Sequence, residues 1–181
     1  MLKKLILSSA MMLSISTSLL AGGSHLNIGT SFTKLDTYDY QIGPEIGMDL
    51  MFSLDDIPWI ESGFSVNLGS VVLMNDAKTE LNTNYVPYAT GLYKVGIDFS
   101  QFSDEFGDGG YPVSFAIGIG YGLGEIDGTY FNGLAYAAMV EVDLFKNIGI
   151  GFSHEQSSAK INDYDFDISK EKIYITIKFN D

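Results

Sequence analysis

Hydrophobic and polar residues alternate along most of this chain. In the segment "YQIGPEIGMDLMFS", the even positions from Tyr40 to Phe52 are apolar, and the odd positions include Gln41, Glu45 and Asp49. A period of two places one set of side chains on each face of a β-strand. The segments 60–73 and 133–145 repeat the pattern. The chain is therefore predicted to fold as amphipathic strands.

Eight such strands are predicted, near residues 25–34, 40–53, 60–73, 85–99, 112–124, 133–145, 147–156 and 171–179. No segment has a convincing period of 3.6 residues, so almost no helix is expected. The even number of strands, with the longer polar connections mostly at one end, predicts an all-β antiparallel up-and-down barrel. Pro44 and Pro87 fall inside predicted strands, and because proline lacks an N–H we expect local bulges or interrupted pairing there.

Two barrels fit this pattern, and they are inside-out versions of each other. A soluble lipocalin-like barrel would enclose its apolar side chains around a ligand, whereas an outer-membrane barrel would turn them towards lipid. The segment "PVSFAIGIGYGLG" separates the two, because glycine weakens a strand that faces water but leaves room inside a narrow barrel. Its spacing glycines are Gly118, Gly120, Gly122 and Gly124. The bulky residues expected opposite them are Met51, Tyr88, Leu92, Met139 and Tyr174.

Aromatic residues and strand lengths support the membrane interpretation. Most aromatic residues of the apolar parity lie near strand ends, as in the interfacial girdles of membrane barrels. Each strand also has about the nine residues that a tilted membrane crossing needs. The aromatic residues in question are Tyr40, Phe52, Phe64, Tyr85, Phe99, Tyr121, Tyr136 and Phe179. The glycine-rich segment "PVSFAIGIGYGLG" is not a nucleotide-binding loop, because its glycines lack the G-x-G-x-x-G spacing.

The first residues predict export. Lys3 and Lys4 precede an apolar run from Leu5 to Leu20, and Ala21 follows it. This is the layout of a signal peptide, so we expect a cleaved leader at 1–21 and a barrel domain at 22–181. The chain has no cysteine, which excludes a disulfide framework and a lipid anchor on a cysteine.

The charge balance is strongly acidic. The formal net charge is −13, and loss of the two leader lysines would leave eight lysines against 23 acidic residues, a net charge of −15. The chain contains no arginine. Binding to nucleic acid requires clustered Lys or Arg, so a nucleic-acid partner is not expected.

The polar parity would bring many carboxylates into a narrow interior. They cannot all remain charged and unpaired there, so they must pair with lysine, accept hydrogen bonds, take up protons or bind cations. We predict a polar network that fills the lumen, and a narrow cation-preferring path is the alternative. The predicted members of the polar network are Glu45, Asp49, Glu61, Lys94, Asp98, Glu141, Asp143 and Lys178, and Glu155 has the same parity.

No metal or other cofactor is expected. The segment "NDYDFDIS" places Asp163, Asp165 and Asp167 on one parity, without the glycine turn and later Glu of a calcium loop. It is interpreted as a hairpin that extends above the membrane, with calcium binding or a surface contact as alternatives.

The carboxyl end carries a resemblance. In "EKIYITIKFND", the residues Ile173, Ile175, Ile177 and Phe179 share one parity and resemble the terminal assembly signal of bacterial outer-membrane barrels. The chain as a whole resembles the small OmpA/OmpX-type outer-membrane barrels. This resemblance implies an eight-stranded transmembrane barrel in the outer membrane of a Gram-negative cell, and insertion by the barrel-assembly machinery. It also implies contact with outer-membrane lipid and lipopolysaccharide. Members usually end on the aromatic residue, and here two residues follow Phe179.

The expected role is structural, or one of surface interaction through the loops of a monomer, without catalysis. The rival classes are a porin-like narrow channel, a soluble lipocalin-like barrel and an outer-leaflet lipid-modifying enzyme. The last is considered because "GFSHEQSSAK" resembles lipid A deacylases, which carry a His and a Ser two residues later. Here Gln156 occupies the second position, and Ser157 would lie on the opposite face from His154.

Overall fold

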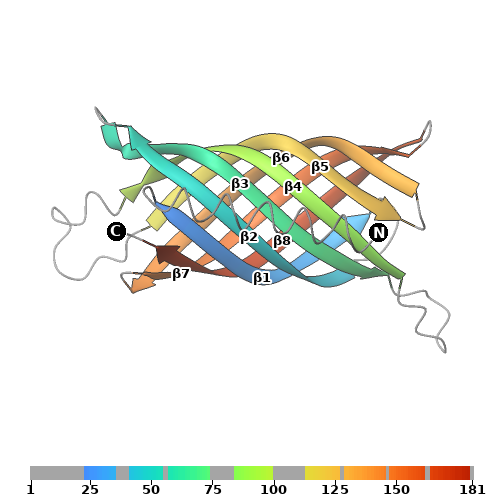
Figure 1. Ribbon diagram of the computed structural model, residues 1–181, viewed down its shortest axis with the longest axis horizontal. Helices are drawn as coiled ribbons and strands as arrows, with labels where there is room; N and C mark the ends of the chain where they lie inside the picture. Colours follow the sequence, from blue (N-terminus) through green and yellow to red (C-terminus); the bar gives the residue numbers. More distant parts are fainter. Residues whose placement is uncertain are drawn as a thin grey trace.

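The chain folds into a closed barrel of eight antiparallel strands joined in sequence order (Figure 1). The computed structural model describes residues 23–35, 41–54, 57–73, 84–99, 113–126, 129–145, 147–161 and 164–179. This confirms the predicted fold class and the number of strands. The strands are β1 (Ser24–Leu35), β2 (Gln41–Leu54), β3 (Ile57–Leu73), β4 (Asn84–Asp98), β5 (Val113–Ile126), β6 (Thr129–Phe145), β7 (Ile148–Ile161) and β8 (Tyr164–Phe179).

Strand register fixes the dimensions of the barrel. One circuit through directly paired residues starts at Ser24 and returns to β1 at Lys34, ten residues further along. The circuit passes through Leu50, Phe64, Tyr93, Ile119, Tyr136, Gln156 and Ser169. Eight strands with a stagger of ten residues tilt by about 40° from the barrel axis, which leaves an interior that side chains can fill.

The two ends of the barrel differ. β1 begins and β8 ends at the same end, on the left in Figure 1, and we call it the terminal end. The opposite end, where β1 is followed by β2 and β7 by β8, is the loop end. Among the described residues, no helix is long and apolar enough to cross a membrane.

Several strands extend further than their polarity indicates. The polar connection expected at 157–170 is largely strand, because β7 and β8 remain paired as far as Ile161 and Tyr164. The expected hairpin is therefore present, but its arms continue the barrel wall. β5 and β6 likewise stay paired to Ile126 and Thr129. Cross-strand hydrogen bonding, which does not depend on side-chain polarity, sustains these segments.

The two prolines interrupt pairing without causing a register shift. Pro44 pairs with Thr30 of β1, but pairing of β2 with β3 begins one residue later, at Glu45. Pro87 pairs with Ser70, and pairing of β4 with β5 begins at Tyr88. Each proline thus lies where one of its two neighbouring ladders has ended. The register shifts lie elsewhere, at Ser53/Leu54 and Asp143/Phe145.

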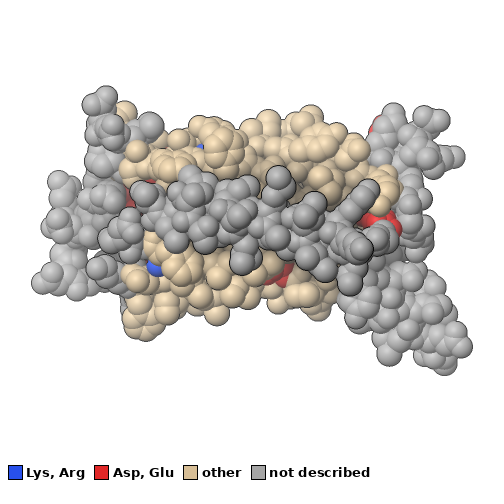
Figure 2. Space-filling model, viewed as in Figure 1, with Lys and Arg blue, Asp and Glu red and all other residues tan. Residues whose placement is uncertain are grey.

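The apolar parity faces outward. Ile117 is 69% exposed and Ile119 is 51% exposed, whereas Glu45 and Lys94 are 3% and 4% exposed. Figure 2 shows one side of the barrel, where few coloured atoms of charged residues interrupt the uncharged wall. A lipocalin-like barrel has the opposite arrangement, so this geometry excludes that alternative.

Aromatic side chains lie on the outer surface, but not all of them are near strand ends. Phe64, Tyr93 and Tyr136 lie in the middle of β3, β4 and β6. Phe64 packs edge-on against Tyr93, with ring centroids 5.4 Å apart. Phe99 and Phe115 form a second edge-on pair near the terminal end. Phe52, Tyr121, Tyr136 and Phe179 are exposed as predicted. Residue Tyr40 and the side chain of Tyr85 lie outside the described part of the chain.

The glycines of β5 have two different surroundings. A Cβ atom added to Gly120 would overlap the backbone carbonyl of Gly91 on β4, so the two strands approach too closely for any side chain there. A Cβ added to Gly122 would meet only Thr90 Oγ1 at 3.9 Å and Ser157 Cβ at 4.0 Å. Gly118 has ordinary contact with Leu92, and Gly124 faces the ring of Phe131.

We expect Gly120→Ala to destabilise the barrel by about 1–3 kcal/mol, because the added methyl must push two backbones apart. Gly122→Ala is the matched control in the same strand and is expected to change stability by much less. Urea unfolding of both variants in lipid vesicles measures the difference. Equal effects from the two substitutions would contradict the close approach at Gly120.

Candidate functional site

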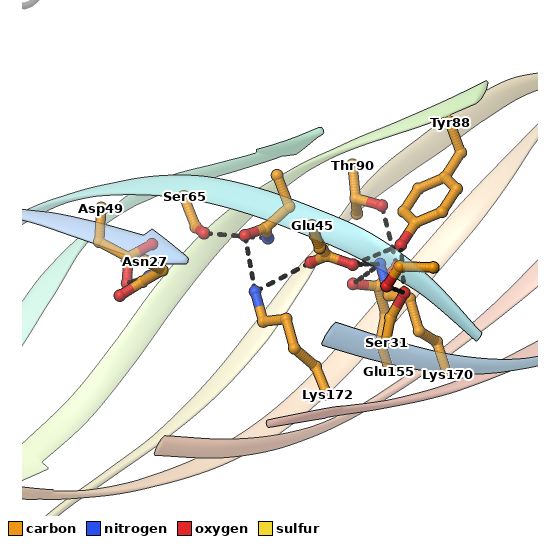
Figure 3. Close-up of polar contacts among 12 residues, drawn as sticks. Asn27, Ser31, Glu45, Asp49, Ser65, Tyr88, Thr90, Glu155, Lys170 and Lys172 are labelled. Atoms are coloured by element: carbon orange, nitrogen blue, oxygen red, sulfur yellow. Dashed lines mark hydrogen bonds and ion pairs between the residues drawn. The ribbon is translucent and has the colours of Figure 1, made fainter. Parts of the chain in front are cut away.

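The lumen near the loop end is organised around Glu45 of β2. Its Oε1 lies 2.9 Å from Lys172 Nζ, and its Oε2 lies 3.3 Å from Lys170 Nζ. The Tyr88 hydroxyl donates a hydrogen bond to Oε2. Both lysines lie on β8, so these contacts cross β1 and join β2 to β8, the two neighbours of β1 (Figure 3).

Glu155 of β7 completes this cluster. Lys170 Nζ lies 3.0 Å from Glu155 Oε2 and 4.5 Å from the centre of the Tyr88 ring. Thr90 donates a hydrogen bond to Glu155 Oε1. Two carboxylates therefore face two ammonium groups, and the cluster has no net formal charge.

A second group of contacts lies deeper along the axis. Lys94 Nζ donates a 2.8 Å hydrogen bond to Asp49 Oδ2, and Asn27 Nδ2 donates another to the same atom. Lys172 also donates to the side-chain oxygen of Asn67, whose amide donates in turn to Ser65. Figure 3 shows Asp49 and Asn27 well separated from the Glu45 cluster, with Lys172 between the two groups.

The terminal end of the lumen is acidic. Lys178 Nζ lies 3.0 Å from Glu141 Oε1 and 2.6 Å from Asp143 Oδ1. The Thr176 hydroxyl lies 2.7 Å from Glu141 Oε2 and 2.8 Å from Asn27 Oδ1. Glu61 lies within electrostatic range of Asp98, Glu141 and Lys178. The predicted residues of this end therefore come together, with more carboxylates than lysines.

Two lysines at the centre of the lumen escaped the sequence analysis. Lys170 and Lys172 share the parity of Lys178. Lys170 precedes residue 171, where the last strand was expected to begin, whereas Lys172 lies inside the expected strand but was not assigned to the network. The sequence signal was the continued parity from Lys170 to Lys178. Because these two lysines match Glu45 and Glu155, the loop half of the lumen is more evenly charged than predicted.

Apolar residues divide the lumen. Leu92, Ala135 and Ala137 form a buried cluster with Met139 packed against it. Met51 and Tyr174 are also buried, which places four of the five bulky residues expected beside the glycines in contact with the interior. Tyr88, the fifth, reaches Glu45. Near the loop end, Val86 and Phe131 are buried as well.

Two small cavities lie among the described residues of the lumen. A cavity of about 30 Å³ near the loop end is lined by Thr33, Thr90, Ser157 and Lys170, among others. A second cavity of about 10 Å³ lies between Asn67 and Lys94. One water needs about 10–15 Å³ of such space, so these cavities have room for a few water molecules. The Thr33 hydroxyl lines the larger cavity and has no protein partner within the described residues.

The His–Ser pair considered for a lipid-modifying enzyme is not assembled, as the strand parity predicts. His154 is exposed on the outer wall, where its Nδ1 lies 2.6 Å from Glu171 Oε1. Ser157 is buried in the lumen, and Ser158 contacts Asp167. Since His154 and Ser157 face opposite sides of the wall, the nucleophile arrangement of the lipid A deacylase resemblance is absent.

The other predicted sites have the following positions. Asp165 and Asp167 are exposed near the loop end, whereas Asp163 lies outside the described residues. No group of three or more metal-binding side chains occurs among the residues that the structure describes. In the expected assembly signal, Ile175 and Phe179 face outward and Ile177 is half-buried.

Comparison with solved structures identifies similar folds. Ail, the attachment invasion locus protein of Yersinia pestis, has 17% identity, covers 87% of this chain and 98% of its own, and gives a TM-score of 0.53. Ail in complex with the heparin analogue sucrose octasulfate gives 18% identity, the same coverage and a TM-score of 0.55. Neisserial surface protein A gives 11% identity, coverage of 86% and 98%, and a TM-score of 0.56.

No protein-family model matches the chain, and no curated protein matches it either. The structural similarity covers nearly the whole barrel and confirms the expected resemblance to small eight-stranded outer-membrane barrels. At these identities the similarity concerns the fold alone.

Proposed function

We propose that this chain is an integral outer-membrane barrel with a structural or surface-interaction role and no catalytic activity. The observation that carries the proposal is the direction of the wall residues: Ile117 and Ile119 face outward while Glu45 and Lys94 are buried inside. A closed barrel with this polarity satisfies its backbone hydrogen bonds within lipid and presents an apolar band to the acyl chains.

The filled lumen supports a structural role over that of a channel. Ion pairs join β8 to β2, β6 and β7, and the Leu92 cluster lies across the interior. A conducting path would need continuous water past these groups, whereas the larger of the two cavities among the described residues is about 30 Å³. The interior side chains therefore act as internal supports of the wall.

The cellular setting follows from the same proposal. Residues 1–21 act as a cleaved signal peptide, and the exported barrel domain at 22–181 is inserted by the barrel-assembly machinery. The outward residues Ile175, Ile177 and Phe179 of β8 form the recognition signal for that step. The inserted barrel is a monomer that contacts outer-membrane lipid and lipopolysaccharide, and its loop end contacts any surface partner.

Membrane fractionation tests the proposal. The protein is expected in the outer-membrane fraction, resistant to carbonate or high-salt washing, and released only by detergent. A soluble periplasmic protein from the same cells serves as the control. Recovery of the chain in the periplasmic extract without detergent would contradict a membrane location.

The ligand in the Ail complex provides a specific contrast. Sucrose octasulfate is polyanionic, and binding a polyanion requires exposed cations. The lysines Lys94, Lys170, Lys172 and Lys178 of this chain face the lumen, Lys34 is the one lysine side chain described on the outer wall, and the chain has no arginine. We therefore expect no retention of the purified protein on a heparin column at physiological salt. Salt-dependent retention would contradict this expectation and would show an exposed anion-binding surface.

A further inference from the structure

On several strands, the outward apolar residues form a run long enough to cross a bilayer. On β2 it runs from Ile42 to Phe52, on β5 from Val113 to Leu123, and on β6 from Leu134 to Leu144. Each run covers eleven residues, in which every second side chain points outward. A tilted strand needs about 9–11 residues to cross a bilayer, so these three strands match a normal hydrocarbon core.

The corresponding run is short on β7 and β8. On β7 the outward apolar residues are only Ile148, Ile150 and Phe152, a run of five residues. On β8 they run from Ile173 to Phe179, which is seven residues. Both runs are shorter than a bilayer crossing needs. The deficit lies entirely towards the loop end.

Polar residues replace the missing apolar ones. His154 and Gln156 on β7 pair with Glu171 and Ser169 on β8, and all four belong to the outward parity. We call these four residues the polar inset. Its His154–Glu171 contact is open to the surroundings, because the two side chains are 47% and 31% exposed.

The residues that flank the polar inset on the neighbouring strands are mostly apolar, and the exception is Lys34 of β1, which pairs with Ser169. Gln156 pairs with Tyr136 of β6, and Glu171 pairs with Phe32 of β1. The other ionisable residues on the described outward face, Lys34, Glu125, Asp165 and Asp167, lie within four residues of a strand end. His154 and Glu171 are each the eighth residue from the loop-end terminus of their strand. The pair is therefore set unusually deep in the wall.

We propose that the polar inset binds lipid headgroups of the leaflet at the loop end, so that the bilayer is thinner along β7 and β8 than along β2, β5 and β6. This inference rests on the proposed membrane location. A short apolar span is accommodated by local thinning of the bilayer. Headgroups can reach the inset without crossing hydrocarbon, because it is continuous with the polar Ser158–Asp167 contact above it.

The chemistry of the inset favours headgroups over a protein partner. It offers hydrogen-bond donors and acceptors, and His154 contacts Glu171 within it, but it contains no apolar side chain that would anchor a protein interface. Zwitterionic or sugar-bearing headgroups present matching polar groups and require no net charge on the wall.

Fluorescence quenching by labelled lipids tests the inference, and the absence of native cysteine allows single labelling sites. Gln156→Cys and the control Leu134→Cys each carry a small fluorophore in phosphatidylcholine vesicles. The vesicles contain lipids with a nitroxide either on the headgroup or at the middle of the acyl chain. We expect stronger quenching of the Gln156→Cys label by the headgroup nitroxide and of the Leu134→Cys label by the chain nitroxide.

A third label separates the two proposals. If the Ile117→Cys label is quenched by the chain nitroxide but the Gln156→Cys label behaves like Leu134→Cys, the bilayer has full thickness at β7 and only the present inference fails. If Ile117→Cys is not quenched by lipid at all, the membrane location itself fails. Quenching at Gln156→Cys that disappears as the protein-to-lipid ratio rises would identify a protein cover and also overturn the inference.

A variant of the inset provides the converse test. His154→Leu combined with Glu171→Leu extends the apolar band, so the Gln156→Cys label is expected to shift towards quenching by the chain nitroxide. The Leu134→Cys label in the same background should not change. If quenching of the Gln156→Cys label were the same in both backgrounds, His154 and Glu171 would not determine the depth of the headgroups.

Discussion

Glu45→Ala is expected to lower the free energy of unfolding of the barrel in lipid vesicles by about 3–5 kcal/mol, the usual cost of removing one partner from a buried ion pair. The Glu45 side chain is fully buried and lies within 3.3 Å of the Nζ atoms of both Lys170 and Lys172. Its loss leaves Glu155 as the remaining carboxylate partner of Lys170 and removes the acceptor of the Tyr88 hydroxyl. Equilibrium unfolding in urea, followed by tryptophan fluorescence, measures the effect.

Two companion variants make this result specific. Asp165→Ala removes an exposed carboxylate near the loop end and should cost less than about 1 kcal/mol. Glu45→Gln keeps the shape and an acceptor for Tyr88 but removes the charge, so an intermediate loss is expected. If Glu45→Ala were no more destabilising than Asp165→Ala, the cluster would not support the wall.

Ile117→Lys is expected to destabilise the barrel by about 2–4 kcal/mol, the cost of a lysine near the bilayer midplane on a lipid-facing wall. Ile117 is 69% exposed and lies near the middle of the eleven-residue apolar run of β5. In water, the same substitution at so exposed a position would change stability little. The decrease in the free energy of unfolding therefore shows whether water or hydrocarbon surrounds the wall.

Tyr130→Lys is the matched control for this substitution. Tyr130 is 70% exposed on β6, close to the loop end and beyond the apolar run of that strand. A lysine there should cost about 0–1 kcal/mol, as near an interface. Urea unfolding in vesicles compares the two variants. A loss at Ile117 no larger than the loss at Tyr130 would mean that no hydrocarbon surrounds β5.

Strand number, order and facing could be predicted from the sequence because a period of two divides side chains between two sides of a wall. The glycines of β5 settled which side is inside, since Gly118 to Gly124 alternate with residues as large as Tyr121. At Gly120, a glycine is required for a further reason that the sequence pattern does not show, because the backbone carbonyl of Gly91 lies too close for a side chain.

Contacts across the lumen could not be predicted in the same way. Parity places Glu45 inside, but the lysine that it contacts depends on strand stagger and tilt. These bring side chains of β8 to Glu45 of β2 across the intervening β1. The polar segment from Ser157 to Lys170 was expected to be mostly a connection, because its composition resembles a loop. Long-range hydrogen bonding to neighbouring strands makes most of it strand and carries Lys170 inside.

The most direct test of the account is a spin-label scan along β5 in lipid vesicles, one cysteine at a time from Val113 to Leu123, with Gly120 left unchanged because no side chain fits there. Accessibility to oxygen, which concentrates in hydrocarbon, is predicted to alternate with a period of two. It should be high at Phe115, Ile117, Ile119 and Tyr121 and low at Ala116, Gly118 and Gly122. High oxygen accessibility at the glycine positions and low accessibility at the isoleucine positions, or no alternation at all, would contradict an apolar wall that faces lipid.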